Sequence, residues 1–452
     1  MRREQRDDRD ESVEPSQSPS TASLDGGYGW VVTTCVAMVN GHSWGISAAY
    51  SVFLAHYLTQ ETFAGATRLQ YAFVGSLGVG CTLLISPLVR IAVREIGTRP
   101  VMVLGALMQS VSLICASLST EIWHLFLSQG ALFGIGMGLL FVPSHGIISQ
   151  WFDKRRAFAN GIAIAGAGLG GLVYSLGTGA MLQSLGLQWA YRILSIISGV
   201  INIACSLFIK TRHGTTESQE AALDLGLLRR KGFMLILAFA WFSMLGYFIL
   251  IFTLANYGKE MGLSPSQAAM IPALFMLGQA MGRPVIGWAG DSWGRINLTL
   301  LATFLTGLLS VIFWMYAKTY GILVIFALLE GSIAGAFWVT VAPIIAGVIG
   351  LENLPSGLSL LWVFVALPST FGTPIALEIV TSTGAYVGAQ LLTGLSFIAA
   401  AVFLLCLRGL EVGQARKIST SASIESKDVS GEMHIGSRIK RFLVACFRWK
   451  MI

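Results

Sequence analysis

The chain has 452 residues, of which 54% are hydrophobic and only 12% are charged, and its formal net charge is +7. A soluble protein of this length carries roughly twice this share of charged residues, so the composition excludes an ordinary soluble globular protein. A nucleic-acid-binding protein would gather its basic residues on one exposed face. Here they lie between long apolar blocks, which is typical of a membrane protein.

Apolar blocks of about 18 to 25 residues recur along the whole sequence, and each can cross a hydrocarbon core of about 30 Å as a helix. Helices are expected because lipid offers backbone groups no hydrogen-bond partners. We therefore predict an all-α membrane protein with twelve transmembrane helices in two six-helix bundles. The predicted spans are 30–57, 69–89, 101–118, 122–149, 157–182, 188–209, 233–257, 266–289, 297–316, 320–348, 356–380 and 385–407.

The polar stretches between these blocks predict the domain organisation. A charged, Ser/Pro-containing tail at 1–28 is expected to be disordered and cytoplasmic. It precedes an N-terminal bundle at 29–209, a cytoplasmic linker at 210–232 and a C-terminal bundle at 233–408. A cytoplasmic C-tail at 409–452 ends in the basic, apolar stretch from Ser437 to Lys450, which suits an interfacial amphipathic helix or, equally, a basic disordered tail.

The distribution of basic residues predicts the orientation. With both termini inside, the external loops hold only Arg68, Lys259 and Lys318 of the 30 lysines and arginines. This asymmetry indicates that both termini are cytoplasmic, and we expect a multi-pass protein of the plasma membrane. The sequon at Asn297 then lies on the cytoplasmic side, so we predict that it is not glycosylated. Five of the six cysteines lie within spans, so a disulfide framework is not expected.

The border between the N-tail and the first span carries the most specific motif. Asp25 is followed by Gly26 and Gly27, which permit a tight turn, and then by the string Tyr28-Gly29-Trp30. This motif resembles the signature at the start of helix 1 in the monocarboxylate porter family of the major facilitator superfamily. The loop between spans 4 and 5, from Gln150 to Gly161, is similar to the second signature of that family and reads QWFDKRRAFANG.

A third motif lies between spans 8 and 9, where Gly287, Asp291 and Arg295 follow the superfamily pattern Gly-x-x-x-Asp-x-x-Gly-Arg. We interpret Asp291 and Arg295 as a conformational latch, since a carboxylate near a helix end and a guanidinium form charge-assisted hydrogen bonds. In the corresponding loop of the first half, the position of the aspartate holds Arg94. The first-half latch is therefore degenerate.

Small residues recur at close spacing on spans 4 and 5, which predicts close helix packing. They are Gly130, Gly134 and Gly138 on span 4, and Gly166, Gly168, Gly170 and Gly171 on span 5.

Arg283 is the strongest candidate for substrate binding. An ionisable residue inside a span is costly and usually functional, although a long side chain near a helix end can also snorkel to the interface. The pair Arg283-Pro284 resembles the helix 8 arginine with which porters of this family hold a substrate carboxylate. The family's acidic residue four positions earlier corresponds to Gln279, and the helix 1 lysine of the lactate-transporting members corresponds to Ala48. A larger or less charged substrate than lactate is therefore plausible.

Glu330 is the candidate for proton coupling. It lies about ten residues into span 10, near the midplane, where it can form a switchable pair with Arg283 or a purely structural polar contact. Asn40 and His42 are mid-span hydrogen-bonding candidates, and Trp338 is a candidate for an aromatic substrate pocket, with packing as the alternative role for each.

The sequence has no phosphate-binding loop, metal-ligand cluster or catalytic nucleophile motif, so we expect neither an enzyme nor a cofactor. The resemblance implies a secondary transporter of small organic acids or monocarboxylates, driven by protons through alternating access. The expected partners are a small organic anion, a proton and the lipid bilayer, without nucleic acid; the oligomeric state stays open. The alternatives are an exporter of an acidic secondary metabolite and a metabolite receptor that does not transport.

Overall fold

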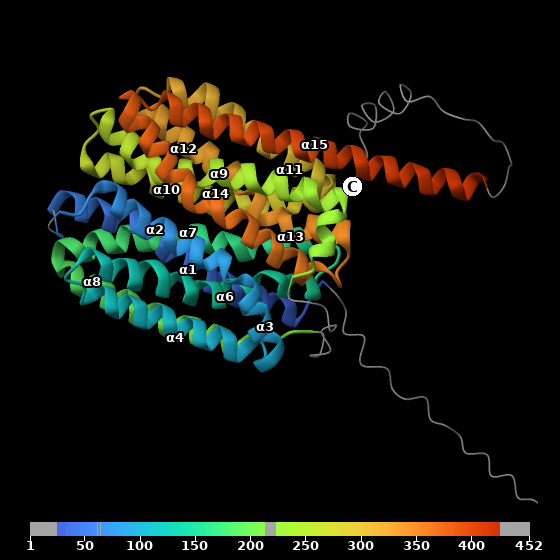
Figure 1. Cartoon of the computed structure of the whole chain (residues 1–452), viewed down its shortest axis with the longest axis horizontal. Helices are drawn as coiled ribbons and strands as arrows, with labels where there is room; N and C mark the ends of the chain where they lie inside the picture. Colours follow the sequence, from blue (N-terminus) through green and yellow to red (C-terminus); the bar gives the residue numbers. More distant parts are fainter. Residues whose placement is uncertain (1–24, 61, 64, 213–222, 425–452) are drawn as a thin grey trace, which may run out of the picture.

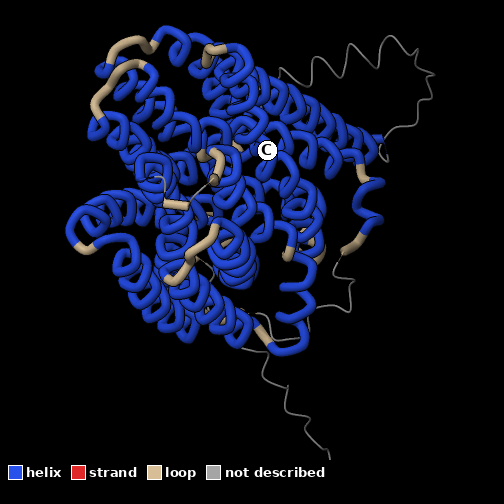
Figure 2. The backbone as a smooth tube through the Cα atoms, turned by 60° about the vertical axis from the view of Figure 1, so that its left-hand side comes forward, coloured by secondary structure: helices blue, strands red, loops and turns tan. Residues whose placement is uncertain are grey.

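The computed structural model of the protein describes residues 25–60, 62–63, 65–212 and 223–424. All regular secondary structure in these ranges is helical (Figure 2). Most of the predicted N-tail, the middle of the predicted linker, and the predicted interfacial helix at 437–450 lie outside the described residues.

The first half of the chain forms one helix bundle, and the boundaries of its helices follow the predicted spans closely. Its elements are α1 (Tyr28–Gln60), α2 (Arg68–Leu84), α3 (Ser86–Ile96), α4 (Thr98–Ser117), α5 (Ile122–Leu125), the π-helical segment η1 (Phe126–Leu132), α6 (Phe133–Trp151), α7 (Arg156–Ser184) and α8 (Gly186–Phe208).

The second half repeats this arrangement after a short 3₁₀ turn, η2 (Leu225–Arg229). Its elements are α9 (Lys231–Glu260), α10 (Pro265–Trp293), α11 (Arg295–Leu309), the π-helical segment η3 (Ser310–Trp314), α12 (Tyr320–Ala334), α13 (Ala336–Ile349), α14 (Leu354–Thr383) and α15 (Val387–Ile424). The helices of the two halves lie on opposite sides of the molecule, and α15 projects beyond the bundle at one end (Figure 1).

Ten helical segments of the described chain are long and apolar enough to cross a membrane, and the bent pair α2–α3 provides an eleventh. The 48° bend in this pair follows from Pro87 in the first turn of α3, because proline removes a backbone donor and cannot continue the preceding helix. The predicted span 69–89 ran through this break. With 33 residues, α1 is long enough for the remaining span, and it carries the polar residues Asn40, His42 and Ser43.

The two bundles meet along two seams. In one, α7 of the first half packs against α10 and α13 of the second; in the other, α2 packs against α14. Gly161 of α7 faces the carbonyl oxygen of Arg283 so closely that an added Cβ would lie 2.5 Å from it. The seam between α7 and α10 therefore depends on contact between the two backbones.

The two family signatures of the first half pack together at one end of the molecule, where α1 and α7 begin and α6 and α10 end; we call this end the termini face. The carboxylate of Asp25 accepts hydrogen bonds from the backbone N–H groups of Asp153, Lys154 and Arg155, at 3.0, 3.2 and 2.9 Å. The ring of Trp30 lies 4.9 Å from that of Phe152. Two motifs more than a hundred residues apart thus form one structural unit.

Candidate substrate site

A cavity lies between the two bundles. It has about 50 Å³ of space for water-sized molecules, and one water needs about 10–15 Å³ on this measure. Arg283, on its wall, is ten residues from the end of α10, which is about 15 Å along a helix. The cavity is lined by residues of both halves: Asn40, Trp44, Ser47, Ala48, Val79, Phe141, Ile164, Ala167, Tyr247, Phe248, Ile251, Phe252, Met276, Gln279, Arg283 and Trp338.

Arg283 is only 2% exposed, and its guanidinium is held by neutral partners. One nitrogen donates to the carbonyl oxygen of Ile164 in α7 at 2.7 Å, and another donates to the hydroxyl of Tyr247 in α9 at 3.0 Å. Among the ion pairs within the described residues, none includes Arg283. A buried charge of this kind is costly unless a counter-ion joins it. The cavity is therefore suited to an anion.

Further polar atoms on the cavity wall have no hydrogen-bond partner within the described chain. They include Nε1 of Trp44, Nε2 of Gln279 and Nε of Arg283, each of which is a donor, and the acceptor Oδ1 of Asn40. Buried polar groups are usually paired, so this group of unpaired atoms indicates that a polar ligand or ordered water completes the site. The three donors favour a ligand with acceptor oxygens, such as a carboxylate.

The structure brings together four of the five residues predicted for substrate binding. Arg283, Gln279, Asn40 and Trp338 all line the cavity, whereas His42 does not. The ring of His42 instead lies 2.8 Å from the carbonyl oxygen of Met38, through Nδ1, and packs edge-on against Tyr174.

Tyr247 and Trp44 are among the cavity residues that were not predicted from the sequence. Tyr247 bridges Arg283 and Gln279, since its hydroxyl donates to Oε1 of Gln279 at 3.1 Å. Trp44 stands on α1, with its ring 5.2 Å from that of Trp338 across the bundle interface. A tyrosine and a tryptophan in mid-span, away from the membrane interfaces where they are usual, were the available signals.

Glu330 lies outside the cavity. It is fully buried on α12, and its Oε1 accepts a hydrogen bond from Ser310 of η3 at 2.9 Å. Its Oε2 has no partner in the described part of the chain. Glu330 therefore faces the interior of its own bundle, and the pair with Arg283 that the sequence suggested is not formed in this conformation.

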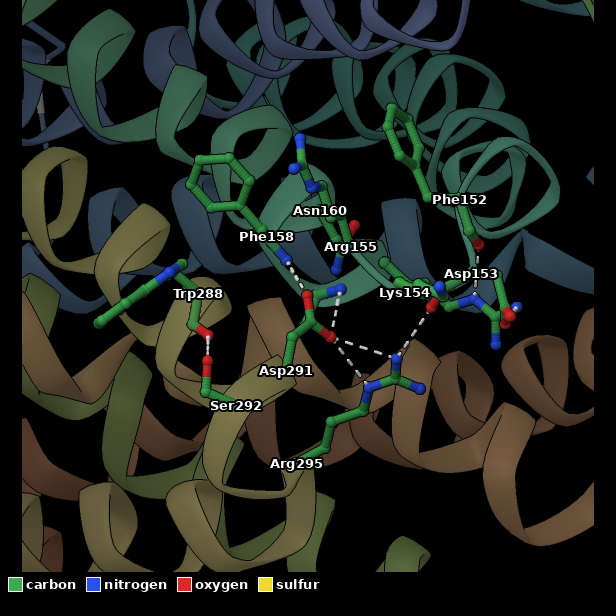
Figure 3. Close-up of polar contacts among 12 residues, drawn as sticks. Phe152, Asp153, Lys154, Arg155, Phe158, Asn160, Trp288, Asp291, Ser292 and Arg295 are labelled. Carbon is green, nitrogen blue, oxygen red and sulfur yellow. Dashed lines mark hydrogen bonds and ion pairs between the residues drawn. The ribbon is translucent and has the colours of Figure 1, made fainter. Parts of the chain in front are cut away.

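Asp291 and Arg295 join the two bundles at the termini face (Figure 3). The carboxylate of Asp291 accepts hydrogen bonds from the backbone N–H groups of Ala157 and Phe158, at 3.2 and 2.9 Å, in the first turn of α7. Arg295 forms an ion pair with Asp291 at 3.2 Å and donates to the carbonyl oxygen of Asp153 at 3.3 Å. An acidic group of one bundle thus caps a helix of the other, at the end where the helix dipole favours negative charge.

In the equivalent loop of the first half, Arg94 forms an ion pair with the neighbouring Glu95 on the surface, at 2.8 Å. Asn297 is the residue of the sequon for which no glycosylation is predicted. Its side chain is buried at the termini face. Its amide nitrogen donates to the carbonyl oxygen of Trp293, and its amide oxygen accepts from Arg408.

Comparison with known proteins identifies the class of protein that this fold and cavity define. The sequence model of the Major Facilitator Superfamily matches residues 32–264 and 236–447 of this chain. The chain belongs to this superfamily. A solved structure of a double-tryptophan mutant of XylE has the same fold, with a TM-score of 0.70 at 14% identity over 84% of this chain and 96% of that chain. The protein is thus a multi-pass membrane transporter, not an enzyme.

Relatives confirm the resemblance to monocarboxylate porters. The probable transporter MCH2 of Saccharomyces cerevisiae is 29% identical over 98% of this chain and 94% of its own. Monocarboxylate transporter 3 of Rattus norvegicus is 28% identical over 90% of this chain and 86% of its own. An agnestins efflux protein of Paecilomyces divaricatus is 27% identical over 80% of this chain and 83% of its own.

Proposed function

We propose that this protein carries small organic acids, and monocarboxylates in particular, across the membrane together with a proton, and that the carboxylate binds to Arg283. Alternating access around the mid-membrane cavity is the mechanism that this fold supports, with the two bundles rocking about the bound substrate. The name of the rat relative fits such a substrate.

The observation that carries the proposal is the buried guanidinium without a counter-ion. In an apolar cavity, the two oxygens of a substrate carboxylate match the fork of donors on an arginine better than any neutral solute does. Gln279 and Trp44 lie on the same wall with unused donors and can hold the substrate oxygens in place. The aromatic side chains Phe141 and Trp338 then contact the organic part of the acid.

Within the proposal, Glu330 carries the proton. A carboxyl group buried with one hydroxyl partner is far more stable when protonated than when ionised, so an ionised Glu330 requires a conformation in which water or a cation reaches it. Both termini are proposed to face the cytoplasm of a cell whose plasma membrane holds the protein. Under this proposal the latch residues Asp291 and Arg295 close the cytoplasmic side.

The test is counterflow of radiolabelled lactate, pyruvate and benzoate in proteoliposomes, with and without an imposed pH gradient. We expect accumulation by the wild type and its loss in Arg283→Gln, with Arg283→Lys retaining a weakened activity. Glu330→Gln should still exchange substrate but no longer respond to the pH gradient. A receptor that does not transport would bind an acid without any counterflow, and that outcome would contradict the proposal.

Export of an acidic metabolite is the second candidate, favoured by the efflux relative and by the aromatic lining of the cavity. The two directions are separated by measuring the accumulation of benzoate in cells that express the protein. Import raises the cellular content and export lowers it.

A further inference from the structure

A second group of unpaired polar atoms lies between the cavity and the termini face. His145 stands on α6, one helical turn beyond the cavity residue Phe141 and about 9 Å from the end of the helix at Trp151. It is 1% exposed, and neither of its ring nitrogens has a hydrogen-bond partner in the described part of the chain. The Nε1 of Trp362, a fully buried residue of α14, also has no partner there.

These two side chains belong to different bundles and contact each other. The rings of His145 and Trp362 lie edge to face, with centroids 5.3 Å apart. Trp362 stacks on Trp338 of the cavity wall at 5.7 Å, and His145 packs on Phe141 at 5.2 Å. The four rings form one cluster that extends from the cavity wall towards the termini face, and the contact between His145 and Trp362 must break when the bundles separate at that face.

We propose that His145 and Trp362 form an inner station for the substrate carboxylate, occupied when the termini face is open. This rests on the proposed function, because it assigns a second position to the same organic anion. Separation of α6 from α14 exposes the imidazole N–H and the indole N–H to the opened path, where both donate to carboxylate oxygens as the acid leaves Arg283. In the closed state these groups are unpaired, and leaving a buried polar group unpaired is unfavourable, which favours opening.

The station predicts an effect on one face of the membrane only. Uptake of radiolabelled benzoate and lactate is measured in right-side-out and inverted vesicles, so that the KM is obtained separately at each face. His145→Phe keeps the ring packing but removes the donor, and we expect it to raise the KM at the termini face about tenfold while the KM at the opposite face changes less than twofold. His145→Gln, which keeps an N–H donor, restores most of the affinity; Trp362→Phe repeats the one-sided effect. His56→Phe is the matched control on a distant part of α1.

A second measurement does not depend on transport. Diethyl pyrocarbonate labelling of His145 in the full-length protein is expected to be slow in the wild type and at least fivefold faster in Asp291→Asn, in which the latch is weakened. Failure of the latch variant to expose His145, or equal KM changes at both faces, would overturn the inner station. If the wild type carries neither acid, the proposed function fails for these probes, while the labelling still decides whether His145 lies on the opened path.

Discussion

Arg283 shows how two departures from the family pattern change the chemistry of a site. With Gln279 at the position of the family's acidic residue and Ala48 at that of its lysine, the cavity wall carries one positive charge and no negative one among its lining residues. The arginine is held by a carbonyl oxygen and a tyrosine hydroxyl, which orient the guanidinium without neutralising it. The substrate itself is then the natural counter-ion.

Asp25 provides a prediction about stability and pH. Partial burial raises the pKa of Asp25, but hydrogen bonds from the backbone N–H groups of Arg155, Lys154 and Asp153 outweigh this effect and hold its pKa below the usual range. A folded-state pKa below the unfolded value, which is about 3.9, means that the stabilisation is complete above that pH and is lost as the pH falls through the folded value.

We therefore expect Asp25→Asn to lower the free energy of unfolding by about 1 kcal/mol, the size of a typical hydrogen-bond loss at a partly exposed site. The thermal midpoint of the detergent-solubilised protein should fall equally at pH 5.5 and pH 7.5, and the difference from the wild type should shrink below about pH 4. Glu95→Gln, on the same face but exposed, is the control. A wild-type advantage that disappears already between pH 7.5 and pH 5.5 would contradict the assignment.

At the residue scale the sequence predicted much of the site, since Arg283, Gln279, Asn40 and Trp338 meet in one cavity. The sequence did not predict which side chains each of these residues contacts. Tyr247 and Gln279 belong to different helices, and their contact depends on the rotation of α9 against α10, which no local pattern specifies. Glu330 faces Ser310 instead of Arg283 for the same reason.

At the scale of elements, the contact between α1 and α7 depends on glycine. A Cβ at Gly170 would overlap the backbone of Gly41, whereas a Cβ at Gly177, two turns further along α7, would meet nothing within 4 Å. We expect Gly170→Ala to lower the free energy of unfolding by about 1–3 kcal/mol through overpacking, and Gly177→Ala to leave it unchanged. Thermal aggregation of the purified protein followed by size-exclusion chromatography measures both, and equal midpoints for the two variants would count against close backbone contact here.

The elements themselves were the most predictable feature, because the length and apolarity of a span are fixed by the bilayer. The glycine spacing on span 5 also identified a real packing face. The bend between α2 and α3 and the π-helical segments η1 and η3 were not predicted. A proline inside an apolar block permits either a kink or a continuous span, and the surrounding helices decide between them.

At the scale of the whole molecule, the termini face is closed by contacts that the bundles share. Gly287 of α10 lies against the carbonyl oxygen of Ala157 in α7, and an added methyl would overlap it. Gly290 on the same helix has only ordinary contacts, the nearest being 3.6 Å from Leu298. The closed conformation therefore tolerates a methyl group at Gly290 but not at Gly287.

We expect Gly287→Ala to shift the population towards the conformation with an open termini face by about tenfold, which corresponds to about 1.4 kcal/mol. Gly290→Ala should leave the ratio unchanged. Spin labels at Lys154 and Glu352, one on each bundle, report the two populations by pulsed electron resonance. An equal response of both variants would show that the seam between α7 and α10 does not set the ratio of the open and closed conformations.

The sequence predicted the class of transporter and its two-bundle plan, but not the conformation. Whether the termini face is open or closed depends on tertiary contacts such as those between Asp291 and the first turn of α7. The free energies of the open and closed states differ by only as much as a few such contacts contribute. The motif indicated the two residues that join the bundles at this face, and the three-dimensional packing determines whether their contacts are made.

Asp25 and Asp291 have one property in common. Each carboxylate accepts hydrogen bonds at this face from backbone N–H groups that lie more than a hundred residues away in the sequence. The two carboxylates thus recognise the path of the chain from Asp153 to Phe158 and leave the side chains of Lys154 and Arg155 outside the contact. The side chains of Lys154 and Arg155 can therefore be replaced, or carry a dye or an affinity handle, without loss of these hydrogen bonds, provided that the length and the curve of the connection are preserved.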